Sequence, residues 1–190
     1  MSEFIFITGG RRSGKSAYAL DLAESIGKKR LYIATAEALD DEMKNRIARH
    51  QKERGDSWVT AEEPIDVAGV IEKAKGHDVI LIDCLTLWLC NIMHKNVPLP
   101  STPSREGRGS NLIEGDEEVL SRIDSLANAC INNKTTVIAV TNELGLGVIP
   151  GDPLSRRYTD LAGIMNQRMA AAANRVVMTV SGIALTIKGQ

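Results

Sequence analysis

Apolar residues recur at two different spacings along the chain. Short runs rich in Ile, Val and Phe predict buried strands, and longer segments in which apolar residues return every three or four positions predict helices that cover them. We expect strands near Phe4–Thr8, Leu31–Ala34, Val79–Asp83, Thr136–Thr141, Arg175–Val180 and Ala184–Ile187. We expect helices at about Lys15–Ile26, Asp40–Arg54, Ile65–Lys75, Leu85–Met93, Gly115–Asn132 and Pro153–Asn174. Strands that alternate with helices predict an α/β fold, a mostly parallel sheet covered by helices.

Two turn signals refine the C-terminal part of this prediction. Gly182 separates the last two strand runs by a short turn, which predicts a hairpin and therefore an antiparallel C-terminal edge. Asp152 is a typical helix N-cap, and Pro153 suits the first position of a helix because no N–H is needed there. The last long helix should therefore begin at Pro153.

The composition changes between His94 and Asp116. Three prolines (Pro98, Pro100 and Pro103) and several Ser and Gly residues leave too little apolar surface here to order a core element. We predict an exposed, flexible loop at about residues 95–115, within a single domain that spans residues 1–190. Both a lid over a binding site and a tolerated surface insertion fit this composition.

The overall composition narrows the class of protein. The 190 residues, 43% hydrophobic and 25% charged, suit one globular domain with a substantial core. Because 23 basic residues stand against 24 acidic ones, the net charge of −1 gives no general attraction to nucleic acid or anionic lipid. No apolar run reaches the ~18 residues of a membrane span, and Phe4–Ile7 is too short for a signal peptide. Three cysteines without CxxC spacing favour reduced thiols over zinc or disulfides. We therefore expect a cytoplasmic protein.

The segment from Gly9 to Ser16 matches the phosphate-binding pattern G-x-x-x-x-G-K-[ST], between a predicted strand and a predicted helix. Its glycines let successive backbone N–H groups point at phosphate oxygens, and the helix N-terminus adds a positive dipole. Lys15 would reach the β- and γ-phosphates, and the Ser16 hydroxyl would ligate Mg²⁺. The predicted nucleotide-binding residues of this P-loop are Gly9, Gly10, Arg11, Arg12, Ser13, Gly14, Lys15 and Ser16.

A second candidate for the metal site ends the buried run Val79–Asp83. An aspartate at a strand end is common as a cap, so the residue alone is a weak signal. In a chain that also carries a P-loop, the Asp83 carboxylate is the expected partner of Ser16 in holding Mg²⁺ or its water shell.

Several classes of protein carry such a loop. Guanine-specific switch proteins read their base with an N-K-x-D sequence, which the nearest candidate, Thr141–Leu144, does not match. A small-molecule kinase suits a chain of this length, because positioning and Mg²⁺ supply most of the catalysis of phosphoryl transfer. A nucleotide-dependent switch or assembly ATPase is the non-enzymatic alternative, and its turnover would need a protein partner.

One histidine lies in a suggestive position. In the predicted helix Asp40–Arg54, His50 falls on the same inward stripe as Met43 and Ile47. Arg46 lies one turn before His50 and should neighbour it on the helix surface. A guanidinium at that distance favours a neutral, nucleophilic imidazole. The residues alone leave both a structural and a nucleophilic role open.

A series of short segments is far more specific together than the P-loop is alone. They are Thr8–Ser16, Tyr32–Ala36, Asp40–Met43, Arg46–His50, Thr60–Glu62, Asp83–Trp88, Thr141–Gly147, Asp160–Gly163, Asn166–Arg168 and Val180–Gly182. In these segments the chain resembles the bifunctional adenosylcobinamide kinase/adenosylcobinamide-phosphate guanylyltransferases of cobalamin biosynthesis. The resemblance covers the whole chain except about His94–Glu117.

The resemblance implies two reactions and their participants. The hydroxyl of the aminopropanol arm of adenosylcobinamide takes the γ-phosphoryl group of ATP or GTP. The new phosphate then takes GMP from GTP, which gives adenosylcobinamide-GDP and pyrophosphate. By the same resemblance, His50 carries the GMP as a covalent adduct, Lys15 serves both reactions, and Glu62 lies near the nucleotide.

The resemblance also implies a homo-oligomer, with the trimer as the family's form. The family often has a second histidine directly before the nucleophile, where this chain has Arg49. The alternative to the bifunctional enzyme is a P-loop small-molecule kinase without guanylyltransferase activity, in which His50 is structural.

Overall fold

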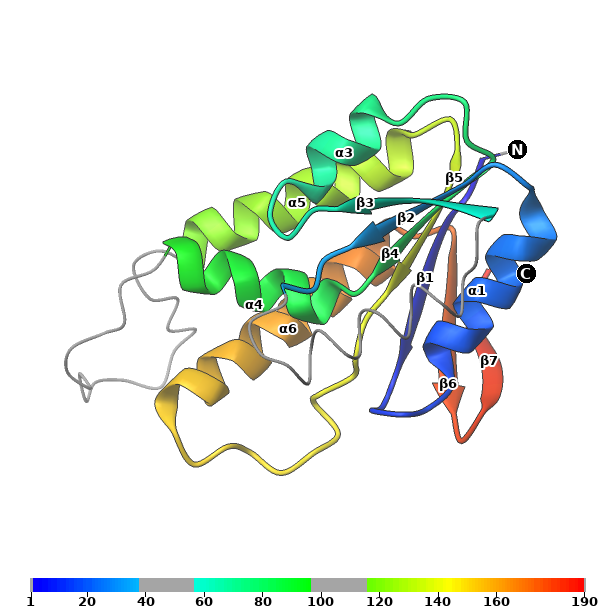
Figure 1. Cartoon of the computed structure of the whole chain (residues 1–190). Coiled ribbons are helices and arrows are strands. Elements are labelled where there is room, and N and C mark those ends of the chain that lie inside the picture. Colours follow the sequence, from blue (N-terminus) through cyan, green and yellow to red (C-terminus); the bar gives the residue numbers. More distant parts are fainter. Residues whose placement is uncertain (1, 38–56, 97–115, 190) are drawn as a thin grey trace.

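The computed structural model describes residues 2–37, 57–96 and 116–189. Its elements in chain order are β1 (Phe4–Gly9), α1 (Lys15–Ile26), β2 (Arg30–Ala34), β3 (Trp58–Glu62), α3 (Val67–Lys73), β4 (Val79–Asp83), α4 (Leu85–Asn96), α5 (Asp116–Asn132), β5 (Thr136–Val140), α6 (Pro153–Ala172), β6 (Arg175–Val180) and β7 (Ile183–Lys188). The described strands form one sheet in the order β3-β2-β4-β5-β1-β6-β7 (Figure 1). The predicted α/β fold is confirmed.

The strands of this sheet run parallel, with β7 as the exception among those described. β1 pairs in parallel with β5 on one side and with β6 on the other, and β7 returns antiparallel to β6. The predicted antiparallel C-terminal edge is therefore confirmed, and Gly182 lies in its turn with a φ of 84°. Because the other strands all point the same way, their carboxyl ends share one edge, where ligands bind in open α/β sheets.

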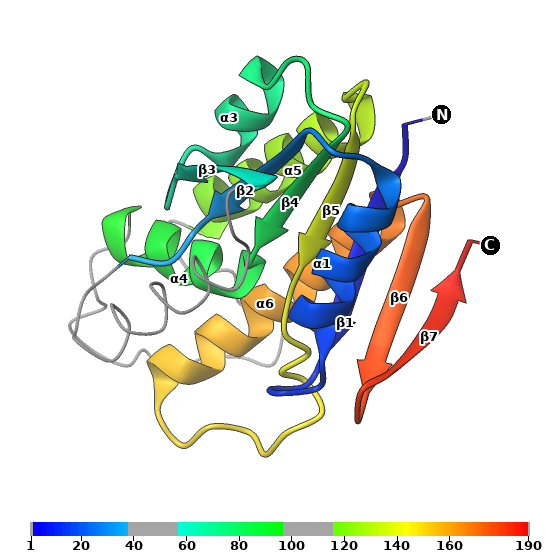
Figure 2. The same ribbon diagram turned by 45° about the vertical axis from the view of Figure 1, so that its right-hand side comes forward.

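Helices cover both faces of the sheet. Figure 2 shows α1 in front of the strands, with α5 and α6 behind them. The alternation of side chains along β1 explains this, because Ile5 and Ile7 pack with Ala19 and Ala23 of α1, whereas Phe6 faces the opposite core. Every residue of β1 is buried, so the P-loop begins at the end of a strand that is packed on both faces.

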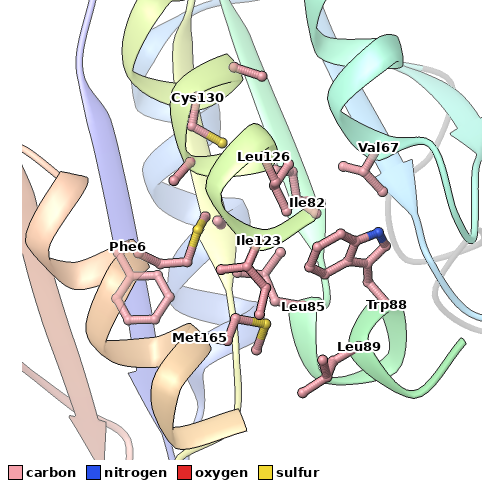
Figure 3. Close-up of a cluster of buried hydrophobic side chains, with 14 of the residues drawn as sticks. Phe6, Val67, Ile82, Leu85, Trp88, Leu89, Ile123, Leu126, Cys130 and Met165 are labelled. Atoms are coloured by element: carbon pink, nitrogen blue, oxygen red, sulfur yellow. The ribbon is translucent and has the colours of Figure 1, made fainter. Parts of the chain in front are cut away.

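The larger of the two cores lies between the sheet and the helices α3 to α6. Figure 3 shows side chains from β1, β4 and four helices meeting there; they are Phe6, Val67, Ile82, Leu85, Trp88, Leu89, Ile123, Leu126, Cys130 and Met165. The polar atom of Trp88 is satisfied, since Nε1 donates to the Ile65 carbonyl oxygen at 2.8 Å. Cys130 is buried there as a free thiol, as predicted.

One strand was missed by the sequence prediction. β3 carries Trp58-Val59-Thr60-Ala61-Glu62, and Trp58 is its one buried residue. Because β3 is an edge strand, it lacks the run of buried apolar residues by which the inner strands are recognised. Its β-branched and aromatic residues were the remaining signal.

Two other predictions fall on residues outside the described ranges. These are the helix Asp40–Arg54 and all but the first two residues of the loop 95–115, since α4 continues to Asn96. The remaining strands and helices lie within a few residues of their predicted bounds. Within the described part of the chain, no helix is long and apolar enough to cross a membrane.

Candidate nucleotide-binding and catalytic site

The P-loop follows β1 as a tight turn at the carboxyl edge of the sheet. The Ser13 N–H donates to the Gly10 carbonyl oxygen at 3.2 Å, which closes the turn. Gly14 ends it with a φ of 94°, a conformation that side chains with a Cβ rarely adopt. Gly9 allows a second close approach, because a Cβ there would lie 2.6 Å from Ser13 Oγ. The glycine pattern therefore serves the geometry predicted for it.

The first turn of α1 presents donors toward this loop. Gly14 is the N-cap of the helix and supplies no side-chain cap, and the first turn contains no acidic residue. The helix dipole therefore favours an anion at the N-terminus of α1, where no side chain caps the helix. Lys15 is 8% exposed, and its Nζ donates to the Gly10 carbonyl oxygen at 3.1 Å. Its ammonium is thus held over the loop, while Arg11 and Arg12 are exposed.

The β6–β7 hairpin supports the loop from one side. Ser13 Oγ and Thr179 Oγ1 lie 2.7 Å apart in a buried hydrogen bond. The Gly182 N–H, in the hairpin turn, donates to the Ser13 carbonyl oxygen at 2.9 Å. Both contacts fix Ser13 and so anchor the loop to the hairpin. The role of Ser13 in nucleotide binding stays a prediction.

Asp83 lies at the end of β4 on the same edge of the sheet. The Tyr32 hydroxyl donates to Asp83 Oδ2 at 2.9 Å, which orients the carboxylate. β5 separates β4 from β1, so Asp83 lies two strand spacings, about 10 Å, to the side of the P-loop strand. The P-loop and Asp83 therefore lie at the same edge of the sheet, with one strand between their strands. The metal-binding role of Asp83 stays a prediction.

The buried thiol of Cys84 lies near charges of both signs. Burial is the largest cause that raises the pKa of Cys84 to about 11, and the negative charge of Asp83 adds to it. The positive charge of Lys15 acts on Cys84 in the opposite direction.

The residues present suit Mg²⁺ by their chemistry. The Ser16 hydroxyl and the Asp83 carboxylate are the hard oxygen ligands that Mg²⁺ takes, usually one or two per protein site beside phosphate oxygens and waters. The described residues contain no group of three or more His, Cys, Asp or Glu side chains that could form a complete metal cage. This donor set fits an ion that arrives with its nucleotide.

A polar cluster beyond the end of β5 joins two of the motif segments, Thr141–Gly147 and Asn166–Arg168, through hydrogen bonds that the sequence did not predict. The Glu143 N–H donates to the Gly9 carbonyl oxygen at 3.0 Å, so the residue directly adjoins the P-loop. Asn166 of α6 donates through Nδ2 to Glu143 Oε2 at 3.3 Å and to the Asn142 carbonyl oxygen at 3.2 Å. The available signal was Asn166 itself, a polar residue on the apolar stripe of α6.

Two predicted site residues are not brought to the P-loop by the described chain. Glu62 is exposed at the end of β3, four strand spacings or about 19 Å from β1, on the same edge of the sheet. Its nucleotide-binding role stays a prediction. His50 lies outside the described residues, so its role stays a prediction as well.

Two arginines of α6 have structural partners. Arg168 donates to Asp124 Oδ2 at 2.7 Å and so ties α6 to α5. Arg156 donates to the carbonyl oxygens of Pro150 and Gly151, at 3.0 and 2.6 Å. Neither contact involves the P-loop.

A parallel sheet whose first strand opens into such a loop, with a carboxylate two strands away, defines a P-loop nucleotide-binding protein. The family model described as cobinamide kinase / cobinamide phosphate guanyltransferase matches residues 5–187. The chain therefore belongs to this family, and the resemblance seen in its motifs is confirmed.

Three curated relatives match nearly end to end. The chain is 41% identical over 186 residues to the bifunctional adenosylcobalamin biosynthesis protein CobP of Pseudomonas aeruginosa, covering 97% of this chain and 96% of that protein. It is 36% identical over 190 residues to the bifunctional adenosylcobalamin biosynthesis protein CobU of Escherichia coli, covering 97% and 99%. The CobU of Salmonella typhimurium is 38% identical over 186 residues, with the same coverage of 97% and 99%.

Proposed function

We propose that this chain catalyses both reactions for which its family is described. In the first, the aminopropanol hydroxyl of adenosylcobinamide takes the γ-phosphoryl group of ATP or GTP. In the second, the resulting phosphate takes GMP from GTP, with release of pyrophosphate. The observation that carries the proposal is the P-loop, with Lys15 held over it, in a chain that matches the family model over residues 5–187.

In both reactions the chain's first task is to bind and neutralise a triphosphate. The backbone N–H groups of the P-loop and of the α1 N-terminus donate to phosphate oxygens, and the Lys15 ammonium offsets the charge that grows on the leaving group. These donors are fixed before the ligand arrives, because Ser13 is anchored by Thr179 and Gly182. The same groups serve attack at the γ-phosphorus and at the α-phosphorus, because the two leaving groups, a nucleoside diphosphate and pyrophosphate, are both polyphosphate anions.

Ser16 and Asp83 are the residues we propose to hold Mg²⁺. When bound, the ion supplies charge stabilisation at the phosphate oxygens. The protein contributes the orientation of the ligands, because the Tyr32 hydroxyl fixes one oxygen of Asp83.

We propose His50 as the nucleophile of the guanylyl transfer. Its imidazole nitrogen would form a bond to the α-phosphorus of GTP as the bond to the pyrophosphate oxygen breaks, and the cobinamide phosphate would then displace the imidazole. Two displacements through a good leaving group replace one slow attack by a weak nucleophile. Family membership and the position of His50 in the motif Arg46–His50 support this assignment.

Mass analysis of the products formed from adenosylcobinamide, GTP and Mg²⁺ tests the whole proposal. We expect adenosylcobinamide-GDP from the native chain, and a His50→Asn variant that stalls at the phosphate. The native chain should also be labelled by α-labelled GTP through a bond stable to alkali and labile to acid. A native chain that forms the phosphate alone and takes no label would favour the kinase-only alternative.

Two further properties belong to the proposal. We expect a homo-oligomer, with a trimer as the first arrangement to test by light scattering. We expect the enzyme to act in the cytoplasm, where its nucleotide substrates are made, and fractionation of cells that express the chain checks this.

A further inference from the structure

The chain leaves β5 along a path fixed by one buried amide. Asn166 is a polar residue on the stripe of α6 that faces the core, and it is only 7% exposed. Its Oδ1 accepts from Thr141 Oγ1 at 3.1 Å, and its Nδ2 donates to the Asn142 carbonyl oxygen and to Glu143 Oε2. A single side chain thus contacts three consecutive residues, so the path of the backbone and the direction of the Glu143 carboxylate are set together.

A second element, α4, holds the first two of these residues, Thr141 and Asn142. Thr86 of α4 accepts from the Asn142 N–H at 2.8 Å, and its Oγ1 lies 3.4 Å from Thr141 Oγ1. The Thr86 carbonyl oxygen in turn accepts from the Tyr158 hydroxyl of α6 at 2.8 Å. Buried polar groups are costly unless every member is paired, so a network like this fixes one geometry. The network ends at the carboxylate of Glu143.

The Glu143 carboxylate is held on both oxygens but retains acceptor capacity. Oε1 accepts from the Gly145 N–H at 3.2 Å, and Oε2 accepts from Asn166 at 3.3 Å. A carboxylate has about four acceptor positions, so each oxygen can accept another hydrogen bond. Glu143 is half-buried, which leaves it accessible to a substrate from the carboxyl edge.

The location of Glu143 separates it from the other acidic residues of this edge. Its N–H donates to the Gly9 carbonyl oxygen, so it lies one strand spacing from the P-loop strand. Asp83 lies two spacings away and is oriented by Tyr32. A turn in which Glu143 merely caps Gly145 would need one hydrogen bond and would not need the buried tether from α6.

We propose that Glu143 is the catalytic residue that receives the acceptor alcohol in the phosphoryl transfer, and that Asn166 is its positioning residue. The inference rests on the proposed function. The Glu143 carboxylate accepts a hydrogen bond from the substrate hydroxyl and aims its oxygen at the γ-phosphorus. As the new O–P bond forms, the bond between the γ-phosphorus and the β–γ bridging oxygen breaks. The nucleoside diphosphate leaves with that electron pair, and the hydroxyl proton passes to Glu143.

The two reactions of the family should therefore depend on Glu143 unequally. The acceptor of the first reaction is a neutral alcohol, which must lose a proton. The acceptor of the second is a phosphate monoester, whose second pKa is about 6, so it is already ionised at neutral pH. Glu143 has a proton to accept in the first reaction and none to accept from the acceptor in the second.

A Glu143→Gln variant tests this difference. Phosphate transfer from γ-labelled ATP or GTP to adenosylcobinamide is followed separately from guanylyl transfer to preformed adenosylcobinamide phosphate. We expect the kinase kcat to fall about 10²- to 10⁴-fold, with the nucleotide KM changed only a few-fold. Guanylyl transfer should stay within a few-fold of the native rate, and that activity also shows that the variant is folded.

Two further variants on α6 separate positioning from folding. Asn166→Ala should lower the kinase kcat more than it lowers guanylyl transfer, because the carboxylate loses its tether. Arg168→Gln is the matched control, since Arg168 lies on the same helix but pairs with Asp124. We expect Arg168→Gln to leave both reactions unchanged.

The outcomes distinguish this inference from the proposed function. If the native chain transfers no phosphate to adenosylcobinamide, the proposed function fails and the inference fails with it. If the native chain performs both reactions and Glu143→Gln keeps the native kinase kcat, the inference alone is overturned. Equal loss of both reactions in a variant with a native melting curve also overturns it, because it would assign Glu143 to triphosphate binding.

Discussion

The two strands next to β1, β6 and β5, make different contacts with the P-loop. On the β6 side, the contacts are the Ser13–Thr179 hydroxyl pair and a backbone hydrogen bond from Gly182. On the β5 side, the backbone contact from Glu143 to Gly9 comes with a carboxylate at the same edge. One neighbour therefore supports the shape of the loop, and the other adds a group that can react.

The connections that follow the two strands explain this difference. β6 is followed by a tight turn through Ser181 and Gly182, both at positive φ, and returns at once as β7. β5 is followed by the segment 141–152, which crosses the carboxyl edge before α6 begins. A tight hairpin turn offers backbone contacts, whereas a longer connection can expose side chains beside a ligand.

We expect the largest effect from a change in the P-loop itself, at Lys15. Lys15→Ala removes the ammonium held over the loop, so we expect kcat/KM of both reactions to fall by at least ~100-fold. Lys28→Ala, an exposed lysine beyond the end of α1, is the control and should behave as the native chain. Near-native kinase activity of a folded Lys15→Ala variant would contradict the role given to the loop.

Asp83 ends β4, the strand beyond β5, and we expect Asp83→Asn to weaken Mg²⁺ binding. The amide keeps the shape of the side chain but removes its charge, so we expect both reactions to need about tenfold or more Mg²⁺ for half-maximal rate. Tyr32→Phe removes only the hydroxyl that orients Asp83 and should shift the titration in the same direction by less. An unchanged Mg²⁺ titration for Asp83→Asn would make this residue a structural strand end.

On the β6 side, Thr179→Val should affect both reactions alike. The substitution removes the hydroxyl partner of Ser13, so we expect a loss of about 1 kcal/mol in unfolding free energy. That corresponds to a Tm lower by about 2–4 °C for a chain of this size. The nucleotide KM should rise by a similar small factor in the two reactions. A selective loss of one reaction would show that this side does more than support the loop, and Thr186→Val, exposed on β7, is the control.

The smallest effect is expected from the cap of the helix that carries Asn166. Asp152 accepts from the Ser155 N–H at 2.8 Å, and the hydrogen bonds from Ser155 lower the pKa of Asp152. A lowered pKa means that the stabilisation is present above the ordinary aspartate pKa of about 3.9 and is lost as the pH falls through the folded-state pKa. Asp152→Ala should lower Tm slightly at pH 7 and converge with the native chain in strong acid. An equal difference at every pH would show that the charge is not involved.

The inner parts of the fold could be predicted from the sequence because their signals are local. The strand runs Phe4–Thr8 and Val79–Asp83 are apolar up to their last residue, and Asp152 with Pro153 marks the start of α6, as the structure has it. β3 was missed because an edge strand with a single buried residue leaves little apolar pattern in the sequence.

In the candidate site, too, one part could be predicted from the sequence and another could not. The P-loop is contiguous in sequence, so its geometry followed from its motif. The link between Asn166 and Glu143 joins residues from two elements, and the sequence carries no information on which partners an amide finds in the core. Polar residues on an apolar helix stripe mark where such a link exists, but the fold is needed to identify the partner.

The last strand has a consequence for handling the protein. Among the described strands, β7 lies at one end of the sheet with its outer edge unpaired, and Ile183, Leu185 and Ile187 are 65%, 50% and 62% exposed. An unpaired edge with apolar side chains is a template for strands of other molecules, which promotes aggregation at high concentration. Lys188 holds the end of this strand in place, because its Nζ donates to the carbonyl oxygens of Ala170 and Ala171 in the last turn of α6. A purification tag appended to the C-terminus is therefore best separated from β7 by a charged spacer, and Lys188 is the residue that a truncation should spare.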